Sequence, residues 1–207
     1  LPSEGWPSKE LHLVLYGLGS SLAAIKAAAY ARWALTVYRA PDVALLDGGI
    51  NAWQAMRYPT ASGHPRANPR GDFQPRWDST RLITFEEINQ SFPSLYFLDA
   101  RTPDQYRGET IPRGSRIAGR IKGAVNVPIQ NLLLPSGAFL RRRKMTALLG
   151  PKFQEAARSR KQIVVYCVSG VQASVLLFAL ELIGGTARLY PGSWTEFSYR
   201  APAEMIE

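Results

Sequence analysis

Two segments of this chain carry the same order of expected elements, and this internal repeat restricts the fold more than any other feature. In each copy an apolar run of strand length is followed by a short turn, a helical pattern and a second short apolar run. Tyr16 aligns with Tyr166, and Ala23 aligns with Ala173. Because strand–helix–strand units build parallel sheets, we predict an α/β fold with a parallel-sheet core flanked by helices. The first copy occupies 11–16, 17–21, 22–37 and 43–46, and the second 162–166, 167–172, 173–183 and 187–190.

The residues between the two copies indicate how the domains are organised. Residues 58–77 are rich in Pro, Gly, Arg and Asn without periodicity, which is typical of a linker. The chain has 207 residues, a length that fits between one and two domains. We therefore predict that 78–207 form a complete domain and that 1–57 form only the second half of another. The further elements expected in 78–207 are a helix from a capping box at 84–87, strands at 95–99 and 124–127, a helical turn at 103–107, and a helix over 144–158 broken at Gly150-Pro151.

Cysteine and histidine are scarce, and this restricts the chemistry. One cysteine, Cys167, excludes a disulfide within the chain and any cysteine-rich metal site. The two histidines, His12 and His64, are too few for a histidine-rich metal site, and packing or surface positions suit both. We expect neither a metal nor another cofactor.

Cys167 follows an apolar strand and precedes a helix. Ligands bind at the carboxyl ends of strands in open α/β sheets. A turn that leads into a helix directs backbone N–H groups inward, and these groups together with the helix dipole lower the pKa of a thiol. Gly170 relieves crowding in such a turn. The sequence therefore favours a nucleophilic thiolate at Cys167, with a buried structural cysteine as the alternative.

The chain is basic, with a formal net charge of +9. An anionic partner is one explanation, and the run Arg141–Lys144 is its clearest candidate. No aromatic residues interleave with that run as an RNA-binding sheet requires, so we expect no nucleic-acid partner. No apolar stretch is long enough to span a membrane. An unpaired thiol suits reducing surroundings, and the basic pI together with the lack of an initiator Met favours the mitochondrial matrix over the cytoplasm.

Four short sequence motifs occur between residues 99 and 197, in the same order as in a known protein family. They are Asp99-Ala-Arg101 with Tyr106–Glu109, then 119–128 (GRIKGAVNVP), then 166–173 (YCVSGVQA), and finally 192–197 (GSWTEF). The set resembles the motifs of tandem-domain rhodanese-type sulfurtransferases. The resemblance extends to 11–57 as the second half of a non-catalytic domain in which Gly17 replaces the nucleophile. Four positions depart from the usual pattern, namely Arg120, Lys122, Val168 and Pro191.

The resemblance implies a chemistry and a set of site residues. Cys167 would take a sulfane sulfur from a small donor, 3-mercaptopyruvate or thiosulfate, and pass it as a persulfide sulfur to cyanide, a small thiol or a thioredoxin-like protein. The neutral Val168 and Ser169 fit 3-mercaptopyruvate better, with Ser169 assisting near the donor. Arg101 and Arg107 would hold the donor carboxylate, since a guanidinium suits bidentate contacts. The rest of the binding loop would be Val168, Gly170, Val171, Gln172 and Ala173.

Two other functions compete with this one. A catalytically silent rhodanese-fold subunit or scaffold would also explain the incomplete first domain, whose missing half a protein partner could supply. A related phosphatase would need an arginine at the end of the cysteine loop, where this chain has Ala173. We therefore discount the phosphatase and predict a sulfurtransferase.

Overall fold

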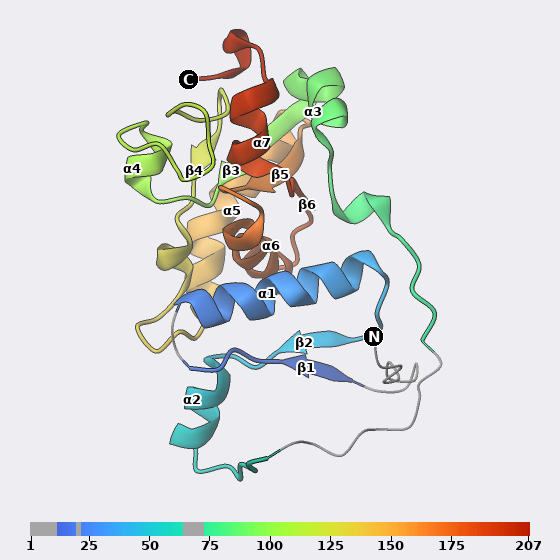
Figure 1. Ribbon diagram of the computed structural model, residues 1–207, viewed down its shortest axis with the longest axis vertical. Helices are drawn as coiled ribbons and strands as arrows, with labels where there is room; N and C mark the ends of the chain where they lie inside the picture. Colours follow the sequence, from blue (N-terminus) through green and yellow to red (C-terminus); the bar gives the residue numbers. More distant parts are fainter. Residues whose placement is uncertain (1–11, 20–21, 64–72) are drawn as a thin grey trace.

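A four-stranded parallel sheet organises the larger part of the molecule (Figure 1). The computed structural model describes residues 12–19, 22–63 and 73–207. The strand order is β4 (Val125–Asn126), β3 (Leu95–Asp99), β5 (Gln162–Tyr166) and β6 (Arg188–Leu189). All neighbouring pairs are parallel, and Asp99 lies opposite Tyr166 in the register of β3 and β5. The carboxyl ends of these two strands therefore meet at one edge of the sheet, directly before Cys167.

Helices cover both faces of this sheet. The helices α5 (Arg142–Arg158) and α6 (Val171–Leu182) pack on one face, and α3 (Phe85–Ser91) and α7 (Ser193–Arg200) pack on the other. Successive side chains of a strand point to opposite faces, so Ile163, Val165 and Cys167 belong to the α5–α6 core while Val164 and Tyr166 belong to the α3–α7 core. This confirms the α/β fold with a parallel sheet between helices.

The N-terminal elements form a second, smaller unit. Strands β1 (Leu13–Leu15) and β2 (Val43–Leu45) are parallel and are joined by helix α1 (Leu22–Val37). Helix α2 (Gly49–Ala55) follows, so the order β1, α1, β2, α2 is the same as that of β5, α6, β6, α7. In Figure 1, α1 lies between the small sheet and α6, and its buried residues share a core with that helix. The division into 1–57, 58–77 and 78–207 stays a prediction, and Leu11, His64 and much of the linker lie outside the described residues.

Two local signals in the sequence have different outcomes. Thr84 and Glu87 form the expected capping box at the start of α3. The expected break at Gly150-Pro151 is wrong, because α5 continues through Pro151. Proline has the φ of a helix, and the carbonyl that it leaves without a donor belongs to the exposed Ala147, where water can reach it. The remaining short elements are α4 (Pro103–Tyr106) and the 3-10 turns Ser79–Arg81, Phe92–Ser94, Ile129–Leu132 and Ala203–Met205.

The C-terminal residues pair with the segment that follows α4. Ile206 forms an antiparallel bridge with Ile121, and the backbone groups of Arg120 and Glu207 exchange two hydrogen bonds of 2.7 and 3.0 Å. Gly119 has a φ of +114°, and a Cβ there would lie 2.4 Å from the Glu207 carbonyl oxygen. Only glycine therefore fits at the point where the chain end closes over this loop.

Candidate active site around Cys167

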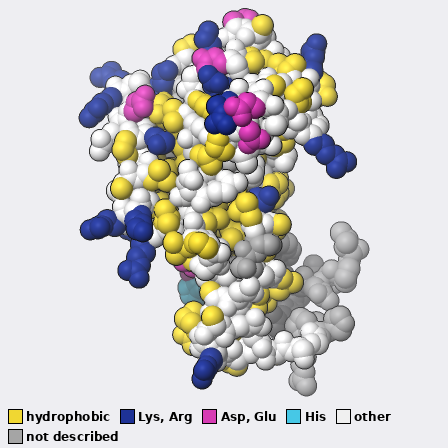
Figure 2. All heavy atoms as spheres, turned by 90° about the vertical axis from the view of Figure 1, so that its left-hand side faces the viewer, with side chains coloured by type: hydrophobic (Ala, Val, Ile, Leu, Met, Phe, Trp, Pro, Cys, Tyr) yellow, Lys and Arg dark blue, Asp and Glu magenta, His cyan; other side chains and the backbone are white. Residues whose placement is uncertain are grey.

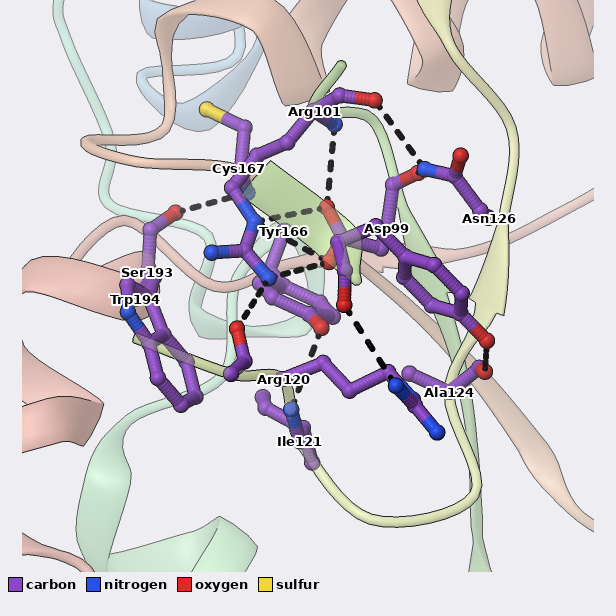
Figure 3. Close-up of polar contacts among 12 residues, drawn as sticks. Asp99, Arg101, Arg120, Ile121, Ala124, Asn126, Tyr166, Cys167, Ser193 and Trp194 are labelled. Carbon is purple, nitrogen blue, oxygen red and sulfur yellow. Dashed lines mark hydrogen bonds and ion pairs between the residues drawn. The ribbon is translucent and has the colours of Figure 1, made fainter. Parts of the chain in front are cut away.

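Cys167 lies in the loop between β5 and α6, at the carboxyl edge of the sheet. Its side chain is 1% exposed and belongs to the core between the sheet and α5–α6. Its backbone N–H donates to Ser193 Oγ at 3.1 Å, and its carbonyl accepts from the Trp194 N–H at 3.0 Å. The next carbonyl, that of Val168, accepts from the Thr195 N–H at 3.0 Å. The start of α7 therefore holds the start of the cysteine loop (Figure 3).

The rest of the predicted loop turns sharply around the thiol. Gly170 has a φ of +82° and is the N-cap of α6, and a Cβ there would lie 3.2 Å from the Pro191 carbonyl oxygen. This conformation favours glycine, as the sequence predicts. Within the loop Ser169 is exposed, Val168, Val171 and Gln172 are partly exposed, and Gly170 and Ala173 are buried. The structure thus brings all seven predicted loop residues together.

The effect on the thiol differs from the prediction. Burial raises the pKa of Cys167 above its ordinary value, and hydrogen bonds from the backbone N–H groups of Ala173, Ser169, Gln172 and Gly170 oppose that rise without cancelling it. The nest of N–H groups is therefore present, but the lowered pKa that we expected is wrong for this structure. The physical reason is that removal of the sulfur from water disfavours the charged thiolate more than the N–H groups favour it.

Arg101 forms a buried ion pair with Asp99 behind the loop. Both side chains are 0% exposed. Asp99 accepts from Arg101 Nη2 at 2.6 Å, from Nε at 3.0 Å and from its backbone N–H at 2.9 Å, and Nη2 also donates to the Gly119 carbonyl at 2.9 Å. Burial alone would lower the pKa of Arg101, but the hydrogen bonds and charge of Asp99 raise it. The guanidinium therefore stays charged and is held in one position.

The guanidinium of Arg101 and the sulfur of Cys167 lie on opposite faces of the sheet. The Arg101 Cζ lies 4.9 Å from the centre of the Trp194 ring and 5.6 Å from that of Tyr166, and both rings belong to the α3–α7 core. In Figure 3 the sulfur points away from the guanidinium. Arg101 is fully buried and paired with Asp99, so a donor carboxylate would have to displace a buried partner, and the contact of Arg101 with a donor carboxylate stays a prediction. Its Nη1, which is buried, has no hydrogen-bond partner among the described residues.

Arg107 lies at the surface, immediately after α4. Its Nε and Nη2 donate to the two carboxylate oxygens of Glu109 at 2.5 and 2.9 Å, and the two side chains are 55% and 53% exposed. Hydrogen bonds to Glu109 raise the pKa of Arg107 above its ordinary value. Because the pair is exposed, a dissolved anion can compete with Glu109 for this guanidinium.

Sequence reasoning missed two residues of the site. Tyr166 is fully buried, and its hydroxyl accepts from the Ile121 N–H at 3.2 Å, which ties the cysteine strand to the 119–122 segment. Burial raises the pKa of Tyr166 well above its ordinary value. Ser193 supports Cys167 directly, and it belongs to the GSWTEF segment whose similarity was noted without a role for the serine. The available signals were the two motifs, YCVSGVQA for Tyr166 and GSWTEF for Ser193.

The described residues hold no group of three or more His, Cys, Asp or Glu side chains that could bind a metal ion. In the same part of the chain, no helix has the length and apolar character needed to cross a membrane.

The fold and the cysteine loop together define a class of protein. Residues 84–200 match the model of the rhodanese-like domain, which is more than half of the chain, and the chain therefore belongs to the rhodanese-like domain family. The match includes Asp99, Cys167 and Ser193.

Several curated proteins that are similar in sequence to this chain are named as sulfurtransferases. The putative thiosulfate sulfurtransferase SseB of Mycobacterium tuberculosis is 34% identical over 174 residues, which cover 82% of this chain and 59% of SseB. A probable 3-mercaptopyruvate sulfurtransferase of Pseudomonas aeruginosa is 35% identical over 194 residues, covering 91% and 65%. The human 3-mercaptopyruvate sulfurtransferase is 29% identical over 199 residues, covering 94% and 65%. The chain thus spans 59% to 65% of the length of these curated relatives.

Solved structures show the same fold over nearly the whole chain. Tum1 of Saccharomyces cerevisiae superposes with a TM-score of 0.76 at 25% identity, covering 96% of this chain and 70% of Tum1. A variant of EanB in complex with ergothioneine superposes with a TM-score of 0.78 at 20% identity, covering 97% and 52%. At that identity EanB supports the fold alone.

Proposed function

We propose that this protein is a sulfurtransferase that carries a sulfane sulfur on Cys167. The cysteine thiolate attacks the sulfur of the donor, a new S–S bond forms and the bond between that sulfur and the rest of the donor breaks. An acceptor thiol then attacks the outer sulfur of the persulfide. The S–S bond to Cys167 breaks, the outer sulfur leaves bonded to the acceptor as the acceptor's persulfide, and Cys167 returns as a thiolate. Cyanide in place of the thiol would leave as thiocyanate.

One observation carries this proposal. The sole cysteine of the chain lies at the carboxyl end of a central strand, and the backbone N–H groups of the following loop act to lower the pKa of its thiol. Such an N–H nest stabilises a thiolate and, after sulfur transfer, the negative charge of a persulfide. A cysteine that served only to fill the core would need no such set of donors.

Two neutral residues after the cysteine favour 3-mercaptopyruvate as the donor. Val168 and Ser169 place no cation beside the sulfur, and a doubly charged thiosulfate would benefit from one. Attack on 3-mercaptopyruvate breaks its C–S bond and leaves the enolate of pyruvate, which takes up a proton. The exposed hydroxyl of Ser169 is our candidate for the donor of a hydrogen bond to that developing charge.

Arg107 is our candidate for binding the donor carboxylate, because its guanidinium is exposed and its partner Glu109 can be displaced. Arg107→Ala is expected to raise the KM for 3-mercaptopyruvate several-fold with little change in kcat. Stability should stay unchanged, since the pair lies in solvent. An unchanged KM would remove Arg107 from the site.

The test is direct. The protein is incubated with 3-mercaptopyruvate or with thiosulfate and its intact mass is measured. A gain of one sulfur atom that is lost in Cys167→Ser and reversed by a thiol supports the proposal. A matched control is Ser174→Ala, which changes a buried side chain of α6 whose hydroxyl donates to the Val171 carbonyl at 2.8 Å. No adduct from either donor, with a protein shown to be folded, would refute it.

A silent rhodanese-fold subunit is the second candidate, and a specific surface favours it. Val14 of β1 (54% exposed) and Tyr16, which directly follows that strand (50% exposed), lie beside a cavity of about 490 Å³. Exposed apolar side chains beside a two-stranded sheet suit a polypeptide partner, and we propose that such a partner packs on this face. Failure of sulfur loading together with stable complex formation through this face would favour the subunit. The cavity is lined by Val14, Tyr16, Leu46, Ile50, Trp53 and 59–61.

A further inference from the structure

The first turn of α7 is joined to the cysteine loop by the three hydrogen bonds that reach Cys167 and Val168. The first N–H groups of a helix have no partner within it, and here the loop carbonyls accept from those of Trp194 and Thr195. The third bond differs in kind, because it runs from the Cys167 N–H to a side chain, the hydroxyl of Ser193. This bond is the one that a substitution can remove.

Ser193 has an unusual backbone. Its φ is +50°, in the left-handed region that non-glycine residues rarely adopt, and its side chain is 0% exposed. Glycine would adopt this conformation without steric cost, yet it has no hydroxyl. The Ser193 hydroxyl donates to the Tyr190 carbonyl at 2.8 Å and accepts from the Cys167 N–H at 3.1 Å. The hydroxyl is therefore used in both directions and links β6 to the cysteine loop.

The position of Cys167 decides whether the loop can stabilise a charge on sulfur. Its backbone N–H is buried, and Ser193 is the partner that fixes it. The backbone N–H groups that act to lower the pKa of the thiol belong to residues of the same loop, namely Ser169, Gly170, Gln172 and Ala173. A shift at the start of the loop would change the distance from the sulfur to all of them together, and a hydrogen bond weakens steeply with misalignment.

We propose that Ser193 is a positioning residue for the nucleophile: its hydroxyl fixes the Cys167 backbone so that the N–H groups of the loop stabilise the charged sulfur. The inference rests on the proposed function, because it assumes that the thiolate and the persulfide are the working forms. Ser193 acts through Cys167 and needs no contact with the donor.

The experiment titrates Cys167 in Ser193→Ala and Ser193→Gly. The ultraviolet absorbance of the thiolate is followed against pH, with Cys167→Ser as the blank, and the rate of alkylation by iodoacetamide is measured near neutral pH. Both variants should raise the pKa of Cys167 by about one unit, which slows alkylation about tenfold. The glycine variant should be more resistant to unfolding than the alanine variant, because it relieves the left-handed conformation. It therefore keeps the test usable if the alanine variant does not fold.

Ser198→Ala is the matched control. Ser198 is also a buried serine of α7, 3% exposed, but its hydroxyl bonds to the Arg116 N–H and the Thr195 carbonyl instead of the cysteine loop. It should lose stability and keep the titration of the unaltered chain. The inference is overturned if Ser193→Gly titrates like the unaltered chain, or if Ser198→Ala shifts the titration equally.

Sulfur loading by 3-mercaptopyruvate is measured separately on the unaltered chain. A chain that takes up no sulfur, but whose thiol titration depends on Ser193, would refute the proposed function and retain the positioning role. A chain that takes up sulfur at the same kcat with and without the Ser193 hydroxyl would refute the positioning role alone.

Discussion

Replacement of Asp99 by asparagine should cost far more stability than its small change in shape suggests. Asp99→Asn keeps the size of the side chain and removes its charge. The carboxylate and the Arg101 guanidinium are both 0% exposed and joined at 2.6 and 3.0 Å. The variant leaves the guanidinium as a buried charge without a counter-charge. Removal of one partner from a buried ion pair costs about 3–5 kcal/mol.

A second pair in the same chain provides the control. Arg107 and Glu109 have the same spacing of two residues and the same two-pronged geometry, but both side chains are more than half exposed. Solvent screens an exposed pair, so Glu109→Gln should change the free energy of unfolding by less than about 1 kcal/mol. Both pairs join an arginine to a carboxylate, so the comparison of Asp99→Asn with Glu109→Gln tests the effect of burial.

Equilibrium unfolding in urea, followed by tryptophan fluorescence, measures both variants. At about 2–4 °C per kcal/mol for a chain of this size, the Asp99→Asn loss corresponds to a Tm lower by about 6–20 °C. The double variant Asp99→Leu/Arg101→Met should recover most of the loss, because no charge is left buried. If Asp99→Asn and Glu109→Gln lose the same free energy, burial does not control the strength of the Asp99–Arg101 pair and the reasoning fails.

Three further predictions follow from single positions. Gly170→Ala should lower stability by about 1–2 kcal/mol in calorimetry, because of its positive φ and the nearby Pro191 carbonyl. Gly184→Ala has a similar φ of +87° and no atom within 4 Å of the added Cβ, so it should lose less stability than Gly170→Ala. Equal losses of stability would exclude the Pro191 carbonyl contact as a cause. Thr84→Ala removes the cap of α3 and should cost about 1 kcal/mol in thermal unfolding, and no measurable change would contradict the cap. Because burial raises the pKa of Cys167, its alkylation rate should still increase at a pH where an unfolded cysteine has levelled off, and a plateau at or below the pH at which the unfolded chain levels off would refute this. The same shift stabilises the fold below the unfolded-state pKa of the thiol, and that contribution is lost as the pH rises through the folded-state pKa.

The sequence predicted the main elements and the place of Cys167 well, because these depend on local patterns. Apolar runs of strand length became β3 and β5, and both cores formed from their alternating side chains. Gly150-Pro151 was predicted to break a helix, and it did not, since an exposed carbonyl can be hydrated instead of bonded. Local propensity alone does not report whether a freed backbone group can reach water.

Local sequence patterns also do not report which charged residues become buried. Arg101 and Arg107 are six positions apart and read alike in the sequence, yet one is fully buried and the other is 55% exposed. The difference depends on Gly119 and Trp194, which approach Arg101 from distant parts of the chain. No pattern within the segment contains that information.

By itself, then, the sequence determined an α/β chain with a repeated strand–helix–strand unit and one cysteine at the head of a helix. Periodicity and motif order carry such information because each element forms from neighbouring residues. Only the tertiary structure decided that burial raises the pKa of Cys167, that Arg101 pairs with Asp99 away from the sulfur, and that Ser193 holds the nucleophile. These properties depend on solvent exclusion and on contacts between residues far apart in the chain, which exist only once the helices have packed on the sheet.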